Sequence, residues 1–200
     1  MPKKIRHDFA IYIAPSIQGY YEDGYPKAFD DTNSLELNPD DINAKIYIYE
    51  RQVNEWFLNR ASSLISEKKN GFIILMICLA YFEGVEQYRT GNSSRWHSSE
   101  FFINSVKRVY GETFENTELE DLYSEARCGL FHNGMVSGKI LIDYSLESSI
   151  EIPNNSTIKI NPKKLLKDIK KDFKKYIKDL KNNSNIDLRV NFDQMFSNVR

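Results

Sequence analysis

Hydrophobic residues along most of the chain recur every three or four positions, as they do on one face of an α-helix. The first such segment follows Asn38-Pro39-Asp40-Asp41, which supplies a cap, a proline and acids for the first turn of a helix. The spacing predicts a long amphipathic helix that ends near residues 68–71, where two lysines and a glycine suit a helix C-terminus. Further helices are predicted at residues 71–89, 98–110, 117–133 and 162–181.

Details of these segments refine the picture. The helix at 71–89 is apolar on all sides over its first three turns, which is typical of a helix in the middle of a bundle. Thr117-Glu118-Leu119-Glu120 reads as a capping box with Thr117 as the cap. Asn161 precedes Pro162 and predicts the start of the last helix.

The hydrophobic period changes to two in two regions. Phe9, Ile11 and Ile13 alternate with other residues and predict a short strand, followed by a loop up to residue 38. Alternation within residues 139–160, around a turn-like Pro153-Asn154, predicts two or three short antiparallel strands.

The predicted fold class is therefore mainly α. We expect an up-and-down bundle of about five helices, with a small antiparallel β insertion before the last helix. The expected organisation is an N-terminal extension at 1–38, a helical domain at 39–181 that includes the insertion at 139–160, and a polar tail at 182–200.

Composition narrows the class of protein. The 200 residues are 41% hydrophobic and 28% charged, as in an ordinary globular protein, and the net charge of −1 argues against a uniformly basic surface. Two cysteines, Cys78 and Cys128, are too few for a disulfide framework or a four-thiolate zinc site. The longest apolar run, 72–82, is short of the roughly 20 residues of a membrane span. We expect a soluble cytoplasmic protein without a metal or cofactor.

Candidate chemistry centres on one histidine. Of His7, His97 and His132, only the last stands near a helix end with an arginine five residues before it, Arg127. A histidine can take a proton from a 2′-hydroxyl or give one to a leaving oxygen, and an arginine can stabilise charge on a phosphate. Five residues at 100° each separate the two side chains by about 140° on an ideal α-helix. A second copy of the helix across a two-fold axis would complete a cleft, so we expect a homodimer.

The segment from Arg127 to His132 resembles the motif of the HEPN superfamily (higher eukaryotes and prokaryotes nucleotide-binding), an arginine and a histidine separated by four to six residues. The resemblance covers about residues 40–134. It implies a dimeric helical bundle whose paired motifs form a metal-independent endoribonuclease site, often in toxin–antitoxin, phage-defence or RNA-processing systems, with Arg127 and His132 as catalytic residues. Active members usually carry a polar residue after the arginine, and this chain has Cys128 there.

Three further residues could support the proposed catalytic pair, and Arg127 and His132 could also have purely structural roles. Cys128, Asn133 and Glu83 are the candidate supporting residues, with Glu83 either orienting Arg127 or His132 or, as we prefer, lying in solvent at a helix end. Arg127 could instead form an ion pair with Glu125 or Glu86, and His132 could bind free carbonyls at the helix end.

A tryptophan and a basic helix offer contacts for RNA. Trp96 beside His97 could stack on a base; packing beneath the bundle is the alternative that we favour. The last helix carries nine lysines against three aspartates, a local charge of +6. Four of them are weak candidates for RNA contact: Lys167, Lys171, Lys174 and Lys178.

Two functions remain open at this stage. The first is a HEPN-type ribonuclease that cleaves RNA through a composite dimer site. The second is a catalytically inactive dimeric module that binds a nucleotide, RNA or a protein partner such as an antitoxin through the same cleft.

Overall fold

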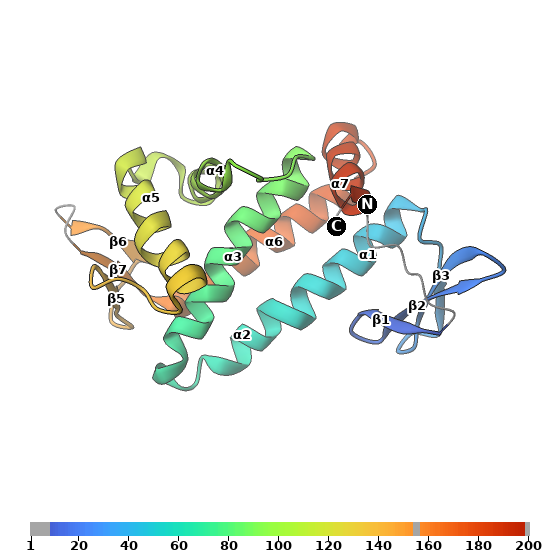
Figure 1. The fold of residues 1–200 in the computed structure, drawn as a ribbon, viewed down its shortest axis with the longest axis horizontal. Helices are drawn as coiled ribbons and strands as arrows, with labels where there is room; N and C mark the ends of the chain where they lie inside the picture. The colour runs from blue at the N-terminus through green and yellow to red at the C-terminus, as the bar shows by residue number, and fades with distance from the viewer. Residues whose placement is uncertain (1–8, 154–156, 199–200) are drawn as a thin grey trace. The chain divides into compact units, whose positions relative to one another are not determined.

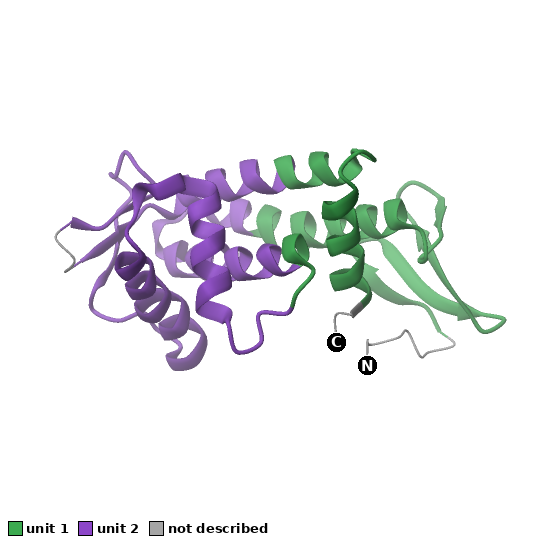
Figure 2. Cartoon of the chain, turned by 90° about the horizontal axis from the view of Figure 1, so that it is seen from above, with its two compact units in different colours: residues 1–60, 88–92, 175–200 green, residues 61–87, 93–174 purple. Residues whose placement is uncertain are grey.

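The computed structural model describes residues 9–153 and 157–198 (Figure 1). Within these ranges the chain is 61% helical, which confirms the mainly α class, and it has 6 helices when contiguous helical segments are counted together, with two small sheets. The chain divides into two compact units (Figure 2). Unit 1 comprises residues 1–60, 88–92 and 175–200, and unit 2 comprises residues 61–87 and 93–174.

Unit 1 contains a four-stranded antiparallel sheet where we predicted one short strand and a loop. Its strands, in sheet order, are β1 (Ile11–Ala14), β2 (Ile17–Glu22), β3 (Tyr25–Asp30) and β4 (Leu35–Leu37). Asp23 and Gly24 join β2 to β3 with φ angles of 51° and 81°. This Asp-Gly pair is a strong hairpin signal in a sequence, and the loop prediction missed it because Gly24 and Pro26 suggested irregular structure.

A second correction concerns the C-terminus of unit 1. Residues 182–200 were predicted to be a polar tail, but α7 runs over Ile186–Asn198. Phe192 of α7 is fully buried, and its ring lies 5.4 Å from the ring centre of Tyr49 and 5.9 Å from that of Tyr88. A few apolar residues on one face are enough to fix this helix, because the aromatic contacts supply its packing energy.

The long first helix predicted near residue 40 is present. Asp41 caps α1 (Ile42–Gln52) by accepting a hydrogen bond from the backbone N–H of Ala44. The helix widens into a π-type turn at Val53–Leu58, continues as α2 (Asn59–Leu64) and so ends before the predicted 68–71.

A buried carboxylate joins this helix to the sheet of unit 1. Asp30, at the end of β3, is 0% exposed and accepts hydrogen bonds from the Tyr47 hydroxyl at 2.5 Å, the Asn33 amide at 2.8 Å and the Arg51 guanidinium at 3.1 Å. Burial alone would raise the pKa of Asp30, but the hydrogen bonds and the charge of Arg51 outweigh it and lower that pKa below 3.8. The ionised form is therefore stabilised in the folded state.

The helices that lie wholly or mainly in unit 2 begin and end close to the predicted residues. They are α3 (Gly71–Thr90), α4 (Ser98–Tyr110), α5 (Asn116–Leu122) and α6 (Pro162–Lys181), with short 3₁₀ turns at Lys68–Asn70 and Gly111–Thr113. The cap of α5 is Glu115 rather than Thr117, with Glu118 completing the capping box. The guanidinium of Arg108 on α4 bonds Glu86 on α3 and Asp172 on α6, so one half-buried cation connects three helices.

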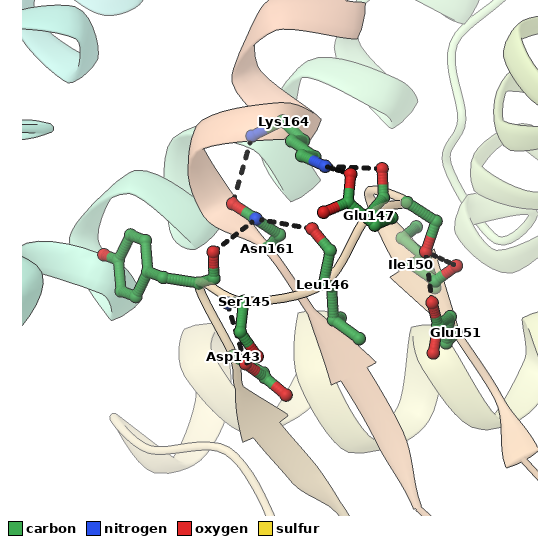
Figure 3. A network of polar contacts seen from close by, with 10 residues as sticks. Asp143, Ser145, Leu146, Glu147, Ile150, Glu151, Asn161 and Lys164 are labelled. Atoms are coloured by element: carbon green, nitrogen blue, oxygen red, sulfur yellow. Dashed lines mark hydrogen bonds and ion pairs between the residues drawn. The ribbon is translucent and has the colours of Figure 1, made fainter.

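The insertion forms a three-stranded sheet of mixed direction. Its order is β5 (Ile140–Ile142), β7 (Ile158–Ile160), β6 (Ile150–Glu151); β6 pairs antiparallel with β7, but β5 pairs parallel with it. The prediction of purely antiparallel strands was therefore wrong. Asn161 lies at the end of this sheet: its amide donates to the carbonyls of Tyr144 and Leu146, and its side-chain oxygen caps α6 (Figure 3).

One helix in the described part of the chain, residues 68–90, has the length and apolar composition of a membrane span. Its most apolar window is 50% buried inside the protein, which also fits the core helix of a soluble protein. The apolar residues of α3 that are fully buried in unit 2 include Ile74, Leu75, Leu79 and Phe82.

Asp30→Asn should lower the free energy of unfolding by about 2–3 kcal/mol, because Arg51 and the hydroxyl of Tyr47 lose a charged acceptor. Ionised Asp30 contributes fully to the free energy of unfolding at pH values above 3.8, the pKa of an ordinary aspartate. This contribution is lost as the pH falls through the lower pKa that Asp30 has in the folded state. Urea unfolding between about pH 6 and about pH 2 should therefore show the wild type and the variant converging in acid. Exposed Asp31, changed to Asn, is the control and should alter stability by less than about 0.5 kcal/mol.

Candidate functional site

The candidate site lies on a helix of unusual width. α5 runs without a break into a π-type helix over Tyr123–Asn133, which contains both Arg127 and His132. Backbone hydrogen bonds in such a helix join residues five apart instead of four. Residues 127 and 132 therefore lie one turn apart, and the angle of about 140° that holds for an ideal α-helix does not apply.

The chain that follows this helix closes tightly against Gly129. Gly134 adopts a left-handed conformation with φ of 72°, and the N–H of Met135 donates to the carbonyl of Gly129 at 3.3 Å. A Cβ at position 129 would lie 2.8 Å from the carbonyl oxygen of Met135, closer than side-chain atoms tolerate. Glycine is needed here for space rather than for an unusual φ angle.

Arg127 is held by a carboxylate from α3. Its Nη2 lies 2.6 Å from Oε2 of Glu83, and the two side chains are only 18% and 12% exposed. The other oxygen of Glu83 accepts a hydrogen bond from the Ser94 hydroxyl at 2.7 Å. Glu83 therefore does not lie in solvent as we expected; it orients Arg127.

The alternative partners proposed for Arg127 are engaged elsewhere. Glu86 pairs with Arg108 at 3.2 Å, and Glu125 pairs with Lys139 at 3.3 Å. The pairing follows from where the helices lie. Glu83 on α3 pairs with Arg127 of the wide helix, and Glu86, one turn further along α3, pairs with Arg108 of α4.

Aromatic rings complete the surroundings of Arg127. Its guanidinium carbon lies 5.5 Å from the ring centre of Tyr123 and 5.2 Å from that of Phe131, within the range of cation–π attraction. Burial acts to lower the pKa of Arg127, but the negative charge of Glu83 outweighs this and raises the pKa. The guanidinium is therefore a permanently charged and closely positioned group.

Three other predicted site residues, Cys128, His132 and Asn133, lie on the wide helix. His132 and Asn133 are exposed there, and the large apolar side chains of Phe131 and Met135 are 44% and 58% exposed. Cys128 is half-buried. Burial, followed by a hydrogen bond with Cys128, raises the pKa of the Tyr123 hydroxyl.

The structure does not gather all the predicted residues in one place. The four candidate lysines form an exposed stripe on α6, a different helix from the one that carries Arg127 and His132. His97 pairs with Glu100 at 3.4 Å, and His7 lies outside the described residues. Trp96 does not pack beneath the helices but is 87% exposed.

Three residues of the site escaped the sequence analysis. Tyr123 and Phe131 stand four residues before and after Arg127, a spacing that does place side chains together on a helix and could have identified them. Ser94 comes from a loop 33 positions away from Arg127, and no local pattern connects the two.

In the described ranges, no three His, Cys, Asp or Glu side chains are grouped so that they could hold a metal ion. Searches with the sequence against family models and curated proteins, and with the fold against solved structures, found no match.

Gly129→Ala should lower the melting temperature, because the added methyl group forces the return segment at Met135 away from the helix. Overpacking of this kind typically costs about 1–3 kcal/mol. Gly84→Ala is the matched control: it is also helical, a Cβ there meets nothing within 4 Å, and alanine should leave the melting temperature unchanged or raise it. Equal effects of the two substitutions would contradict the tight closure at Gly129.

Proposed function

We propose that the protein is a metal-independent endoribonuclease of the HEPN type, acting in the cytoplasm as a homodimer. The observation that carries the proposal is the π-type helix, in which the positioned Arg127 and the exposed His132 fall one turn apart near an exposed helix end. The bundle would be formed by α3, α4, α5 and α6, with a second copy supplying the other half of a composite cleft.

The chemistry assigned to the site is transesterification at phosphorus. One His132 takes the proton from a ribose 2′-hydroxyl, whose oxygen then forms a bond to phosphorus while the bond to the 5′-oxygen breaks. The partner's His132 gives a proton to the departing 5′-oxygen, and the products are a 2′,3′-cyclic phosphate and a free 5′-hydroxyl. Arg127 stabilises the charge that develops on the phosphate.

Glu83 would act as a positioning residue. It engages Arg127 through Nη2, whereas a guanidinium has five N–H donors in all, so a phosphate can be bound through others. A protein that cleaves RNA in this way fits a role in toxin–antitoxin or phage-defence systems, with an antitoxin or another protein as its regulator.

A specific observation favours a second function. The Glu83 carboxylate offsets much of the charge of Arg127, and Cys128, which lies beside the Tyr123 hydroxyl, is a weak hydrogen-bonding group. An inactive dimeric module that binds a nucleotide, RNA or a protein partner through the same surface would tolerate both features.

Purified protein should cut single-stranded RNA in the presence of a chelator and leave 2′,3′-cyclic phosphate ends. His132→Ala should abolish cleavage while changing stability by about 1 kcal/mol or less, because a histidine at a helix end contributes little. His97→Ala is the control and should cut RNA like the wild type, since His97 is an exposed histidine outside the site. Intact RNA with the wild type, or continued cleavage by His132→Ala, would exclude the proposed activity.

The residue after Arg127 should tune the rate. Cys128→Asn is expected to raise cleavage several-fold with little change in melting temperature, because an amide is a stronger hydrogen-bond donor and acceptor than a thiol. Cys128→Ser, with a smaller polar side chain, serves as the comparison. A lower melting temperature without faster cleavage would instead show that Cys128 is a packing residue and would favour the inactive module.

A further inference from the structure

A tryptophan in the loop before α4 projects into solvent from a constrained backbone. Trp96 is 87% exposed and has a φ of 70°, in the left-handed region that large side chains rarely occupy. Both features cost free energy: the indole leaves much apolar surface in water, and the backbone is strained. Among the described residues, the guanidinium of Arg95 lies over one side of the ring, and most of the indole stays in solvent, so packing within the fold does not explain its position.

The loop nevertheless holds Trp96 in a defined place. Ser94 is buried, its N–H donates to the side chain of Gln87 at 3.1 Å, and its hydroxyl donates to Glu83 at 2.7 Å. The N–H of His97 closes the turn by donating to the carbonyl of Ser94 at 2.7 Å. Anchors on both sides of Trp96 fix the backbone that presents the ring.

The same anchor connects Trp96 to the candidate site. Glu83 binds Ser94 with one carboxylate oxygen and Arg127 with the other. Trp96 is therefore two residues from Ser94, whose hydroxyl binds the same carboxylate as Arg127. A ligand whose phosphate reaches Arg127 would have its neighbouring groups within reach of this loop.

We propose that Trp96 is a stacking platform for a base of single-stranded RNA bound beside Arg127; the location of the scissile phosphate rests on the proposed function. Arg95 supports one side of the ring, with its guanidinium carbon 5.6 Å from the ring centre, and adds a positive charge for the RNA backbone. The other side of the indole accepts a base. Stacking of this kind needs no particular base, because every base has a π-face.

The surroundings of the ring favour a nucleic acid over a protein. The residues next to it in the sequence, Ser93, Arg95 and His97, are polar and exposed, so Trp96 is a single tryptophan in a polar loop that carries one arginine. Protein interfaces bury a contiguous apolar patch of several residues around such an anchor. A lone aromatic side chain with an adjacent arginine matches the way in which proteins bind single strands.

The test uses the intrinsic fluorescence of the 200-residue chain, which has two tryptophans, Trp56 and Trp96. In Trp56→Phe, Trp96 is the one source of tryptophan emission, and titration with a single-stranded RNA carrying 2′-O-methyl riboses should quench this emission saturably. The methyl groups block cleavage, so binding is measured separately from catalysis. In Trp96→Phe, only Trp56 emits, and the same RNA should leave its emission unchanged.

Affinity provides the second measurement, with the same blocked RNA carrying a dye. Trp96→Ala should raise Kd by roughly 5- to 140-fold, the usual range for loss of one stacked base. Trp96→Phe retains an aromatic face and should stay within about threefold of the wild type, and Trp56→Phe should match the wild type.

The outcomes separate this inference from the proposed function. If RNA quenches the emission of Trp96 but the protein never cuts RNA, the stacking platform is supported and the ribonuclease activity is excluded. The stacking platform alone would be wrong if Trp96→Ala cleaves RNA at the wild-type rate and binds it with the wild-type Kd, and if RNA does not quench the emission of Trp56→Phe. If Trp96→Ala instead converts a dimer to a monomer with an unchanged Kd for RNA, the residue is a contact between copies, and the inference is wrong.

Discussion

The carboxylate of Glu83 is the group on which the arrangement of the site depends. It joins α3, the wide helix and the loop before α4 by receiving Arg127 at 2.6 Å and Ser94 at 2.7 Å. A charge that is only 12% exposed is costly without partners, and each of its oxygens has one here. Because both partners come from outside α3, satisfying this one charge also fixes where they lie.

The wide helix adds a second constraint. A π-type segment is less favourable than an α-helix and is common at functional sites, so its persistence over Tyr123–Asn133 needs a local cause. The close approach of Met135 to Gly129 and the left-handed turn at Gly134 provide one, because they fix the path of the chain as it leaves the helix. The same widening shifts His132 round toward the side that carries Arg127, so one backbone feature serves both packing and the proposed chemistry.

Trp96 and Arg127, the two side chains that we propose to contact RNA, are held in place in two different ways. Arg127 is set between aromatic rings and a carboxylate, where its charge and direction are fixed before anything binds. Trp96 is held through its backbone, while its ring is left uncovered. Groups fixed in advance lose little entropy on binding, which is the advantage of preorganisation in a binding or catalytic site.

The sequence by itself determined the positions of α3, α4 and α6, because their hydrophobic spacing and end signals are local. It also identified Arg127, His132 and Glu83 as candidates. It did not reveal α7, whose apolar face acquires meaning only through the rings of Tyr49 and Tyr88 on other helices. The sheet of unit 1 was also missed, although the Asp23-Gly24 pair is a local signal of its β2–β3 hairpin; the link from Asp30 of this sheet to Arg51 of α1 was not visible in the sequence. The parallel pairing of β5 with β7, the choice of Glu83 over Glu86 as the partner of Arg127, and the exposure of Trp96 were likewise decided by the tertiary structure. Each depends on which residues meet across long stretches of chain, and a local pattern cannot contain that information.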